Sequence, residues 1–443
     1  MITDTIVALS TAPLESAIAV IRMSGKDAYP ILGQVLDSPF KQDDHRKIIH
    51  GHIIDKETNE TIDDVVVTIY KGPKSFTGED MVEIACHGSL IVINRIIALC
   101  IKYGARQAQR GEFSEKAFLN GKIDLIQAES INDLIHATNE TATKVAVQGL
   151  KGNVSNKIQE LRTDLIDIIS HIEINIDYPE YEDIEELTNE ILLPKINELL
   201  VKTQRTLDEA RTGKMLKDGI KVAIVGKPNA GKSSLLNALL EEDKAIVTDI
   251  AGTTRDVVEG RLSIGGLPFL FLDTAGIRNP ANKVEQIGVE RSKKAIEEAD
   301  IVIMVIDGSK SGKQTIEEKI EGKPVIVVIN KADLGIKNQE KGIQVSALSG
   351  SIEPLKEELV KKAGIEITEY DQYALLSNAR QIGLMLKAHK ELEEAKNACI
   401  NSTPIDLIYI DLNLALDAIL EILGLKSKTD LEAEVFSRFC VGK

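Results

Sequence analysis

Short runs of β-branched and apolar residues, separated by turn residues, mark the first part of the chain. They cover residues 5–9, 17–23, 64–70 and 81–86. Runs of this length and composition, bounded by turn residues, are typical of β-strands. Residues 1–118 are therefore predicted to form a strand-rich α+β domain.

The period of the hydrophobic positions changes after about residue 122. Apolar residues then recur at intervals of three and four, which predicts one apolar stripe along a long helix: Val154, Ile158, Leu161, Leu165, Ile168, Ile172 and Ile176. The same spacing returns in 382–392 and 408–423. Because such stripes must be covered, we expect 119–215 and 369–443 to pack together as one discontinuous helical domain. Two separate helical pieces are the alternative.

Five strand-like runs alternate with helical patterns between these two blocks. They span residues 220–225, 262–272, 301–306, 325–329 and 343–345. This alternation favours a mostly parallel α/β sheet with right-handed crossovers. We therefore predict an α/β domain over 216–368, inserted into the helical domain.

A phosphate-binding motif opens this α/β domain. Residues 226–233 read Gly-Lys-Pro-Asn-Ala-Gly-Lys-Ser, follow a predicted strand and begin a predicted helix. In that context the backbone N–H groups cradle phosphates, Lys232 reaches the β- and γ-phosphates, and Ser233 binds Mg²⁺. The alternative is a Gly-rich turn without a ligand. The nucleotide contacts predicted here are Asn229, Ala230, Gly231, Lys232, Ser233 and Ser234.

Two segments further along follow the order of guanine-nucleotide switches. Asp273 ends a predicted strand, where it can hold Mg²⁺ through water, and the Gly276 N–H can sense the γ-phosphate. A hydroxyl of Thr253 or Thr254 can complete the metal shell only when a γ-phosphate is present. The GTP contacts predicted from these segments are Thr248, Asp249, Ile250, Ala251, Gly252, Thr253, Thr254, Asp273, Thr274, Ala275 and Gly276.

The choice of base follows from residues 330–333, Asn-Lys-Ala-Asp, at the end of a predicted strand. The Asp333 carboxylate only accepts hydrogen bonds, so it matches guanine N1–H and the 2-amino group and repels adenine N1. Leaving it unpaired costs on the order of 1 to 3 kcal/mol, which favours GTP over ATP. The base-site residues predicted are Asn330, Lys331, Ala332, Asp333, Ser346, Ala347 and Leu348.

Ile277 stands where many small GTPases carry a glutamine that orients the attacking water. Another group must then orient the water, and a cation or a partner must meet the charge of the transition state. Local candidates are Glu285, Glu290, Arg255 and Arg278, although spacing alone favours a solvated surface charge for each of them.

Composition and charge exclude several classes of protein. The 443 residues carry a net charge of −16, which disfavours broad electrostatic capture of nucleic acid. Four scattered cysteines make a disulfide framework or a zinc site improbable. No apolar run reaches the roughly 18 residues of a membrane span, and the start lacks a secretion signal. We expect a cytoplasmic protein without membrane association.

The whole chain resembles the MnmE (TrmE) family of tRNA wobble-uridine modification GTPases. The resemblance rests on these segments together with the GTPase motifs: 4–8, 75–80, 110–122, 249–256 and the terminal 439–443, Phe-Cys-Val-Gly-Lys. It implies a multidomain protein with an α+β N-terminal folate-binding domain, a discontinuous α-helical domain and an inserted Ras-like α/β P-loop GTPase domain.

The resemblance also implies a potassium-stimulated GTPase whose G domains meet face to face. By position in the family, Mg²⁺ would bind Ser233 and Thr254. Glu285, twelve residues after Asp273, matches the water-orienting glutamate of the family. Potassium would stand where an arginine finger stands in other GTPases, coordinated by Asn229, Thr248, Ile250 and Thr253.

Residues 1–118 would bind a folate of the 5-formyl- or 5,10-methylene-tetrahydrofolate type and form a homodimer. The folate contacts implied by the family are Arg22, Glu83, Lys122 and Lys443. Cys440 is either a nucleophile or a small buried apolar residue. The family adds a (carboxymethyl)aminomethyl-type group to C5 of the wobble uridine, position 34 of tRNA, in a heterotetramer with the FAD-dependent MnmG. No GxGxxG opens a βαβ unit here, so flavin and NADH must belong to that partner.

A GTP-switch ribosome-assembly factor without modification chemistry is the alternative. Such factors usually append a basic RNA-binding module, and this chain is acidic and lacks a KH-like GXXG loop. Folate binding by residues 1–118 would separate the two hypotheses.

Overall fold

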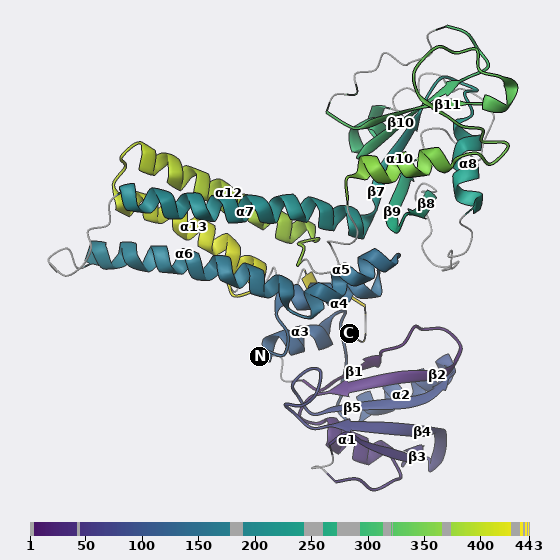
Figure 1. Cartoon of the computed structure of the whole chain (residues 1–443). Helices are drawn as coiled ribbons and strands as arrows, with labels where there is room; N and C mark the ends of the chain where they lie inside the picture. Colours follow the sequence, from purple (N-terminus) through teal and green to yellow (C-terminus); the bar gives the residue numbers. More distant parts are fainter. Residues whose placement is uncertain are drawn as a thin grey trace. The chain divides into compact units, whose positions relative to one another are not determined.

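The computed structural model describes two compact units, and each is treated by itself. The first comprises Met1–Ile135, Gly149–Leu200 and Leu384–Lys443, and the second His136–Gln148 and Val201–Gly383. Figure 1 labels most of their helices and strands. Within them the structure describes residues 4–41, 45–177, 189–242, 260–272, 293–312, 320, 322–365, 374–426, 435–436, 439–440 and 442.

A six-stranded sheet in the order β3-β4-β5-β2-β1-β6 begins the first unit. The strands are β1 Ile6–Leu9, β2 Ser16–Ser24, β3 Lys47–Asp55, β4 Glu60–Tyr70, β5 Met81–Gly88 and β6 Arg106–Gln107. All pairs are antiparallel except β1 with β6. The prediction missed β3, because His50, Gly51 and His52 interrupt its apolar run.

Two helices cover one face of this sheet, α1 (Ala28–Val35) and α2 (Leu90–Lys102). Their apolar sides bury the central strands in one hydrophobic core that includes Leu32, Ile96, Ile21, Val67 and Ile84. The polar side chains of Arg22, Tyr70 and Glu83 lie on the opposite face of the sheet, where they line a cavity.

Helices form the rest of the first unit. They are α3 Glu112–Leu119, α4 Leu125–Ile135, α5 Glu140–Leu150, α6 Asn153–Asp177, α7 Asn189–Asp218, α12 Ala379–Ile400 and α13 Ile405–Leu423. Three of them, α5, α7 and α12, are divided between the two units. The predicted stripe of α6 is buried from Val154 to Ile172, whereas Ile176 near the helix end is exposed. Helix α6 packs on α13, which comes from after the insertion, so the helical domain is discontinuous as predicted. Its bounds, 119–215 and 369–443, stay a prediction. None of the described helices combines the length and apolarity needed to cross a bilayer.

The second unit holds a sheet in the order β12-β11-β10-β7-β9-β8. Its elements are β7 Ile220–Val225, α8 Lys232–Glu242, β8 Gly260–Ile264, β9 Leu267–Leu272, β10 Ile301–Asp307, β11 Val325–Asn330, the 3₁₀ helix η1 Ala332–Leu334, β12 Ile343–Gln344 and α10 Glu353–Ala363. Every pair is parallel except β8 with β9. This confirms the predicted α/β P-loop fold, in which the strand ends of β7, β10 and β11 meet at one edge.

The single strand predicted over 262–272 is wrong, because this segment is a hairpin. Gly265 and Gly266 have φ angles of 57° and 80°, which L side chains rarely adopt. Two consecutive positive φ values are those of a type I′ hairpin turn, which suits the twist of the flanking strands. The apolar run continues through the turn, so hydrophobicity alone did not mark the break.

Candidate functional site

The phosphate loop joins β7 to α8 at the edge where the parallel strands end. Asn229 has a left-handed φ of 63°, and Gly231 a φ of 95°. A Cβ at Gly231 would clash with the side-chain amide of Asn330, so glycine is required by the neighbouring loop as well as by the backbone. The loop therefore leads into the N-terminus of α8, where N–H groups and the helix dipole favour phosphate.

Lys232 is the first residue of α8, and its ammonium group reaches back across the loop. Its Nζ donates to the carbonyl oxygens of Gly226 at 2.8 Å and Lys227 at 3.2 Å. Burial lowers the pKa of Lys232. The charge thus lies over the loop, where a phosphate group can compete for it. Ser233 and Ser234 follow it in the first turn of α8.

Asn330 connects the phosphate loop to the loops that follow β11 and β12. Its side chain is almost fully buried, at 2% exposure. Nδ2 donates to the carbonyl of Ala230 at 3.1 Å, and Oδ1 accepts from the N–H of Ala347 at 3.1 Å. One amide group therefore uses both its donor and its acceptor to hold three segments together.

The Asp333 carboxylate lies exposed on η1, directly after β11. Its Oδ1 accepts a hydrogen bond from the Ser346 hydroxyl at 2.6 Å. Ser346 in turn accepts at Oγ from the N–H of Ser349 at 3.3 Å. The side chain is thus oriented by a second loop, and its carboxylate retains acceptor capacity for a base edge. Ala332, Ala347 and Leu348 lie on the same two loops, Leu348 with its side chain 82% exposed.

Lys331 takes part in an ion pair that the sequence reading did not predict. Its Nζ donates to Asp307 Oδ2 at 2.8 Å and to the Asn229 carbonyl at 2.8 Å. Burial acts to raise the pKa of Asp307, but hydrogen bonds from Lys331 and Ser309 outweigh it and the pKa is lowered. The signal was available, because Asp307 is an acidic residue that ends an otherwise apolar strand.

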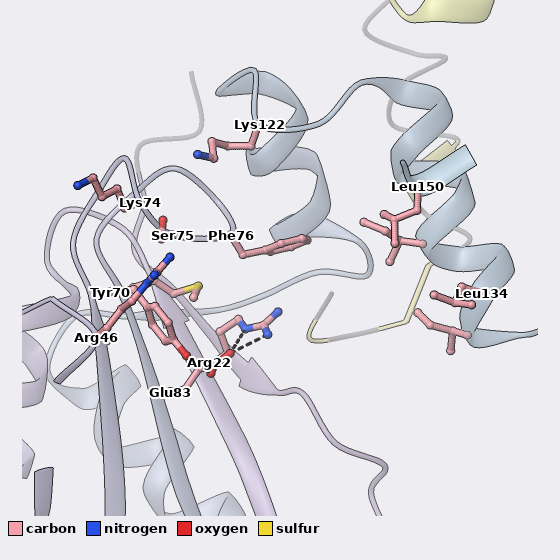
Figure 2. Close-up of a pocket in the computed structure, with 13 residues that line it drawn as sticks. Arg22, Arg46, Tyr70, Lys74, Ser75, Phe76, Glu83, Lys122, Leu134 and Leu150 are labelled. Carbon is pink, nitrogen blue, oxygen red and sulfur yellow. Dashed lines mark hydrogen bonds and ion pairs between the residues drawn. The ribbon is translucent and has the colours of Figure 1, made fainter. Parts of the chain in front are cut away.

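The first unit has a separate cavity of about 750 Å³ on the polar face of its sheet. Arg22 on β2 stands opposite Glu83 on β5 in the strand register, and its Nε and Nη2 donate to Glu83 Oε1 at 3.0 and 2.7 Å. The Tyr70 hydroxyl donates to Glu83 Oε2 at 3.1 Å. Burial, and then the Glu83 charge, raise the pKa of Tyr70. Figure 2 shows these three side chains at one end of the cavity.

Aromatic rings and the end of the chain surround Arg22. Its guanidinium carbon lies 5.4 Å from the ring centre of Phe76 and 5.7 Å from that of Phe113. The Gly442 carbonyl accepts from Arg22 Nη1 at 3.4 Å and from Ser10 Oγ at 3.1 Å. Lys122, whose Nζ donates to the Pro73 carbonyl at 2.9 Å, also lines the cavity. The structure therefore brings together Arg22, Glu83 and Lys122, three of the four predicted folate residues, next to the C-terminal segment.

Family models match the chain over both units. The model described as "GTP-binding protein TrmE N-terminus" matches residues 5–122, and that described as "MnmE helical domain" matches residues 125–440. The chain belongs to the MnmE family of tRNA modification GTPases. The resemblance seen in the motifs is thereby confirmed.

MnmE relatives align over nearly the full length. The "tRNA modification GTPase MnmE" of Levilactobacillus brevis is 42% identical, and the alignment covers 99% of this chain and 98% of the relative. The MnmE proteins of Ligilactobacillus salivarius and Lactobacillus acidophilus are 43% and 44% identical, with the same coverage of both chains. The chain is similar to them in all its parts.

Several of the residues that the MnmE motifs single out lie outside the described residues. They are Thr248, Asp249, Ile250, Ala251, Gly252, Thr253, Thr254, Asp273, Thr274, Ala275, Gly276, Glu285 and Lys443. Of the predicted metal ligands, the structure describes Asn229, which is exposed at the tip of the phosphate loop, and Ser233. The roles of the remaining residues stay predictions from the sequence.

Cys440 of the terminal MnmE motif is exposed, so one of its two predicted roles, that of a small buried residue, is wrong. Its carbonyl accepts from the N–H of Gly111 at 3.2 Å, which ties the C-terminal segment to the start of α3. The sequence reading also missed Tyr70 and Arg46 as cavity residues. The pairing of β4 with β5 places Tyr70 there, and Arg46 is held by its N–H, which donates to the Ile69 carbonyl.

Proposed function

We propose that this MnmE-family chain is a potassium-stimulated GTPase of the cytoplasm that modifies C5 of the wobble uridine, position 34, of certain tRNAs. The added group is of the (carboxymethyl)aminomethyl type, and its one-carbon unit comes from a tetrahydrofolate. The observation that carries the proposal is the cavity lined by Arg22, Glu83 and Lys122. The same chain carries the predicted base-site carboxylate of Asp333, which Ser346 orients. A GTP switch that only assembles ribosomes has no use for such a cavity.

The chemistry of the cavity fits a folate. Its volume of about 750 Å³ is in the usual range of small-molecule sites, roughly 300 to 1,000 Å³. The Glu83 carboxylate can accept from pterin N–H groups, while Phe76 and Leu134 offer apolar contact to the rings. Lys122 and Lys443 can meet the glutamyl carboxylates. When bound, the folate supplies the carbon unit, and these residues bind and orient it.

The nucleotide site fits Mg²⁺ and potassium through hard oxygen donors. Ser233 and Thr254 would hold Mg²⁺, and Asn229, Thr248, Ile250 and Thr253 would hold potassium. When bound, potassium adds positive charge beside the γ-phosphate, in place of an arginine finger. Lys232 holds the β- and γ-phosphates, and Glu285 orients the attacking water. The exposed, left-handed Asn229 at the loop tip supports its part in this set.

A partner must complete the reaction, because the sequence carries no dinucleotide fingerprint for FAD or NADH. We propose the FAD-dependent MnmG as that partner, in a heterotetramer with a homodimer of this chain. GTP hydrolysis would then drive the association of the G domains, while the redox step takes place in the partner.

Nucleoside analysis of tRNA from a strain that lacks this protein tests the proposal. The wobble uridines should lack the aminomethyl-type group, and the wild-type gene should restore it. A strain that expresses the Glu285→Ala variant should resemble the deletion strain, because hydrolysis is needed. Wobble uridines that remain fully modified in the deletion strain would contradict the proposal.

A further inference from the structure

The charges that line the cavity of the first unit are unbalanced. Four cationic side chains line it, Arg22, Arg46, Lys74 and Lys122, against the carboxylate of Glu83. Arg22 already binds Glu83 through two N–H groups. No carboxylate among the described residues pairs with the other three cations. The described lining of the cavity therefore carries positive charge with which an anionic ligand can pair.

These three cations come from three separate segments of the chain, and a hydrogen bond to a backbone carbonyl fixes each of them. Arg46 precedes β3, has a φ of 55°, and its N–H donates to the Ile69 carbonyl at 2.7 Å. Lys74 is in the loop between β4 and β5, where its N–H donates to the Lys71 carbonyl at 2.9 Å. Lys122 follows α3 and donates through Nζ to Pro73 of that same loop. We call Arg46, Lys74 and Lys122 the cationic rim.

The wall away from the cationic rim is apolar. It consists of Ile131, Leu134, Ile135 and Leu150. In Figure 2 Arg46 and Lys74 lie to the left of the cavity, and Leu134 and Leu150 lie to the right. A ligand that satisfies both walls has a flat apolar body and several anionic groups at one end.

We propose that the cationic rim binds the γ-linked polyglutamyl tail of a folate, so that polyglutamylated folates are the preferred ligands of this chain. The inference rests on the proposed function, since it concerns the same folate. A monoglutamyl folate has two carboxylates, and each further glutamyl residue adds one. Arg46 and Lys74, which the family resemblance does not include among the folate contacts, would meet the added carboxylates.

The expected gain in folate affinity can be calculated from the known strength of solvent-exposed ion pairs. Each such pair strengthens binding by less than about fivefold, because solvent screens it. Two added carboxylates should therefore give about tenfold tighter binding. Since the Debye length falls from about 10 Å at 0.1 M salt to about 3 Å at 1 M, the gain should shrink as salt is added.

Isothermal titration of the full-length protein with 5-formyl-tetrahydrofolate, as its monoglutamate and as its γ-triglutamate, tests the inference. The triglutamate should bind about tenfold more tightly at low salt and lose most of that advantage at high salt. In the Arg46→Gln and Lys74→Gln double variant, the two affinities should converge. The monoglutamate affinity itself should change by less than about threefold.

Lys56→Gln is the matched control. Lys56 lies in the turn between β3 and β4, outside the cavity lining, and like Lys122 it donates through Nζ to a backbone carbonyl, that of Gly33. This variant should keep the preference for the triglutamate. Urea unfolding of all variants checks that they fold. If the double variant does not fold, Arg46→Gln and Lys74→Gln are titrated as single variants, and each should lose part of the preference for the triglutamate.

Equal affinities of the wild-type protein for the two folates would overturn the inference and leave the proposed function intact. An equal loss of both affinities in the rim variants would also overturn it, because the rim would then bind the body of the folate. If neither folate binds, the folate part of the proposed function fails, and the inference fails with it.

Discussion

Asp307 and Lys331 form an ion pair that links two strand ends to the phosphate loop. Asp307 ends β10 and stands opposite Asn330 in the register of β10 and β11, directly before Lys331. The Lys331 Nζ lies 2.8 Å from Asp307 Oδ2 and donates to the Asn229 carbonyl at the same distance. The loop predicted to read the base and the loop predicted to hold the phosphates are thus fixed to each other through one ammonium group.

We expect Asp307→Asn to weaken GTP binding by about tenfold. The variant keeps the shape of the side chain but removes the charge that orients Lys331, and hydrogen bonds to charged groups contribute about 1.5 to 3 kcal/mol. Fluorescence titration with a labelled guanine nucleotide measures the affinity. Glu357→Gln, an exposed carboxylate on α10, is the control and should bind like the wild type. Wild-type affinity of Asp307→Asn would show that Lys331 needs no carboxylate partner.

Asp333→Asn should change the base preference of the nucleotide site from guanine to xanthine. The carboxylate accepts from guanine N1–H and the 2-amino group, whereas an amide can donate to the carbonyl at C2 of xanthine. GTP affinity should fall by at least tenfold and the affinity for xanthosine triphosphate should rise. Competition of the two nucleotides for the same labelled ligand measures both. Unchanged preference for GTP would mean that Asp333 does not read the base.

The long helices and the nucleotide-binding strands could be predicted because their signals are local. Val154 to Ile172 keep a helical period over five turns. The run 220–225 is apolar except for Lys221 and is bounded by glycines. The hairpin at Gly265 and Gly266 was missed, since the apolar pattern on its two sides is continuous. Strand β3 was missed for the opposite reason, because polar His50 and His52 face solvent from within it.

The motifs predicted which residues bind phosphate and base, but not the groups that hold these residues in place. The role of Asp307 depends on β11, which is distant in sequence and adjacent only in the sheet. Tyr70 and Arg46 line the cavity because β4 pairs with β5 and Arg46 bonds to the end of β4. Such roles follow from strand order and register, which one sequence does not contain.

His52 should titrate above its ordinary pKa of 6.5. The hydrogen bond between its Nδ1 and Asp37 Oδ2, 2.8 Å long, is the main cause of the raised pKa. The stability contributed by this pair is therefore fully present below pH 6.5 and is lost as the pH rises through the raised pKa of His52. NMR titration of histidine-labelled protein measures it, with His52→Gln to assign the signal. A pKa at or below 6.5 would contradict the pairing, and Asp37→Asn should bring the pKa back toward 6.5.

Glu285→Ala should abolish GTP hydrolysis while GTP affinity stays within about twofold of the wild type. The proposed role of Glu285 is to orient water in the transition state, which affects kcat and leaves ground-state binding unchanged. Single-turnover hydrolysis and nucleotide titration together separate the two effects. A parallel loss of affinity and rate would make Glu285 a binding or folding residue instead.

The rate of GTP hydrolysis in KCl, compared with the rate in NaCl at equal ionic strength, tests the potassium mechanism most directly. Removing a charge that stabilises the transition state costs on the order of a hundredfold in kcat. We expect hydrolysis in KCl to be faster by about that factor, and the advantage to disappear in Asn229→Ala. Equal rates in the two salts would contradict the proposal that a potassium ion, held in part by Asn229, replaces the arginine finger.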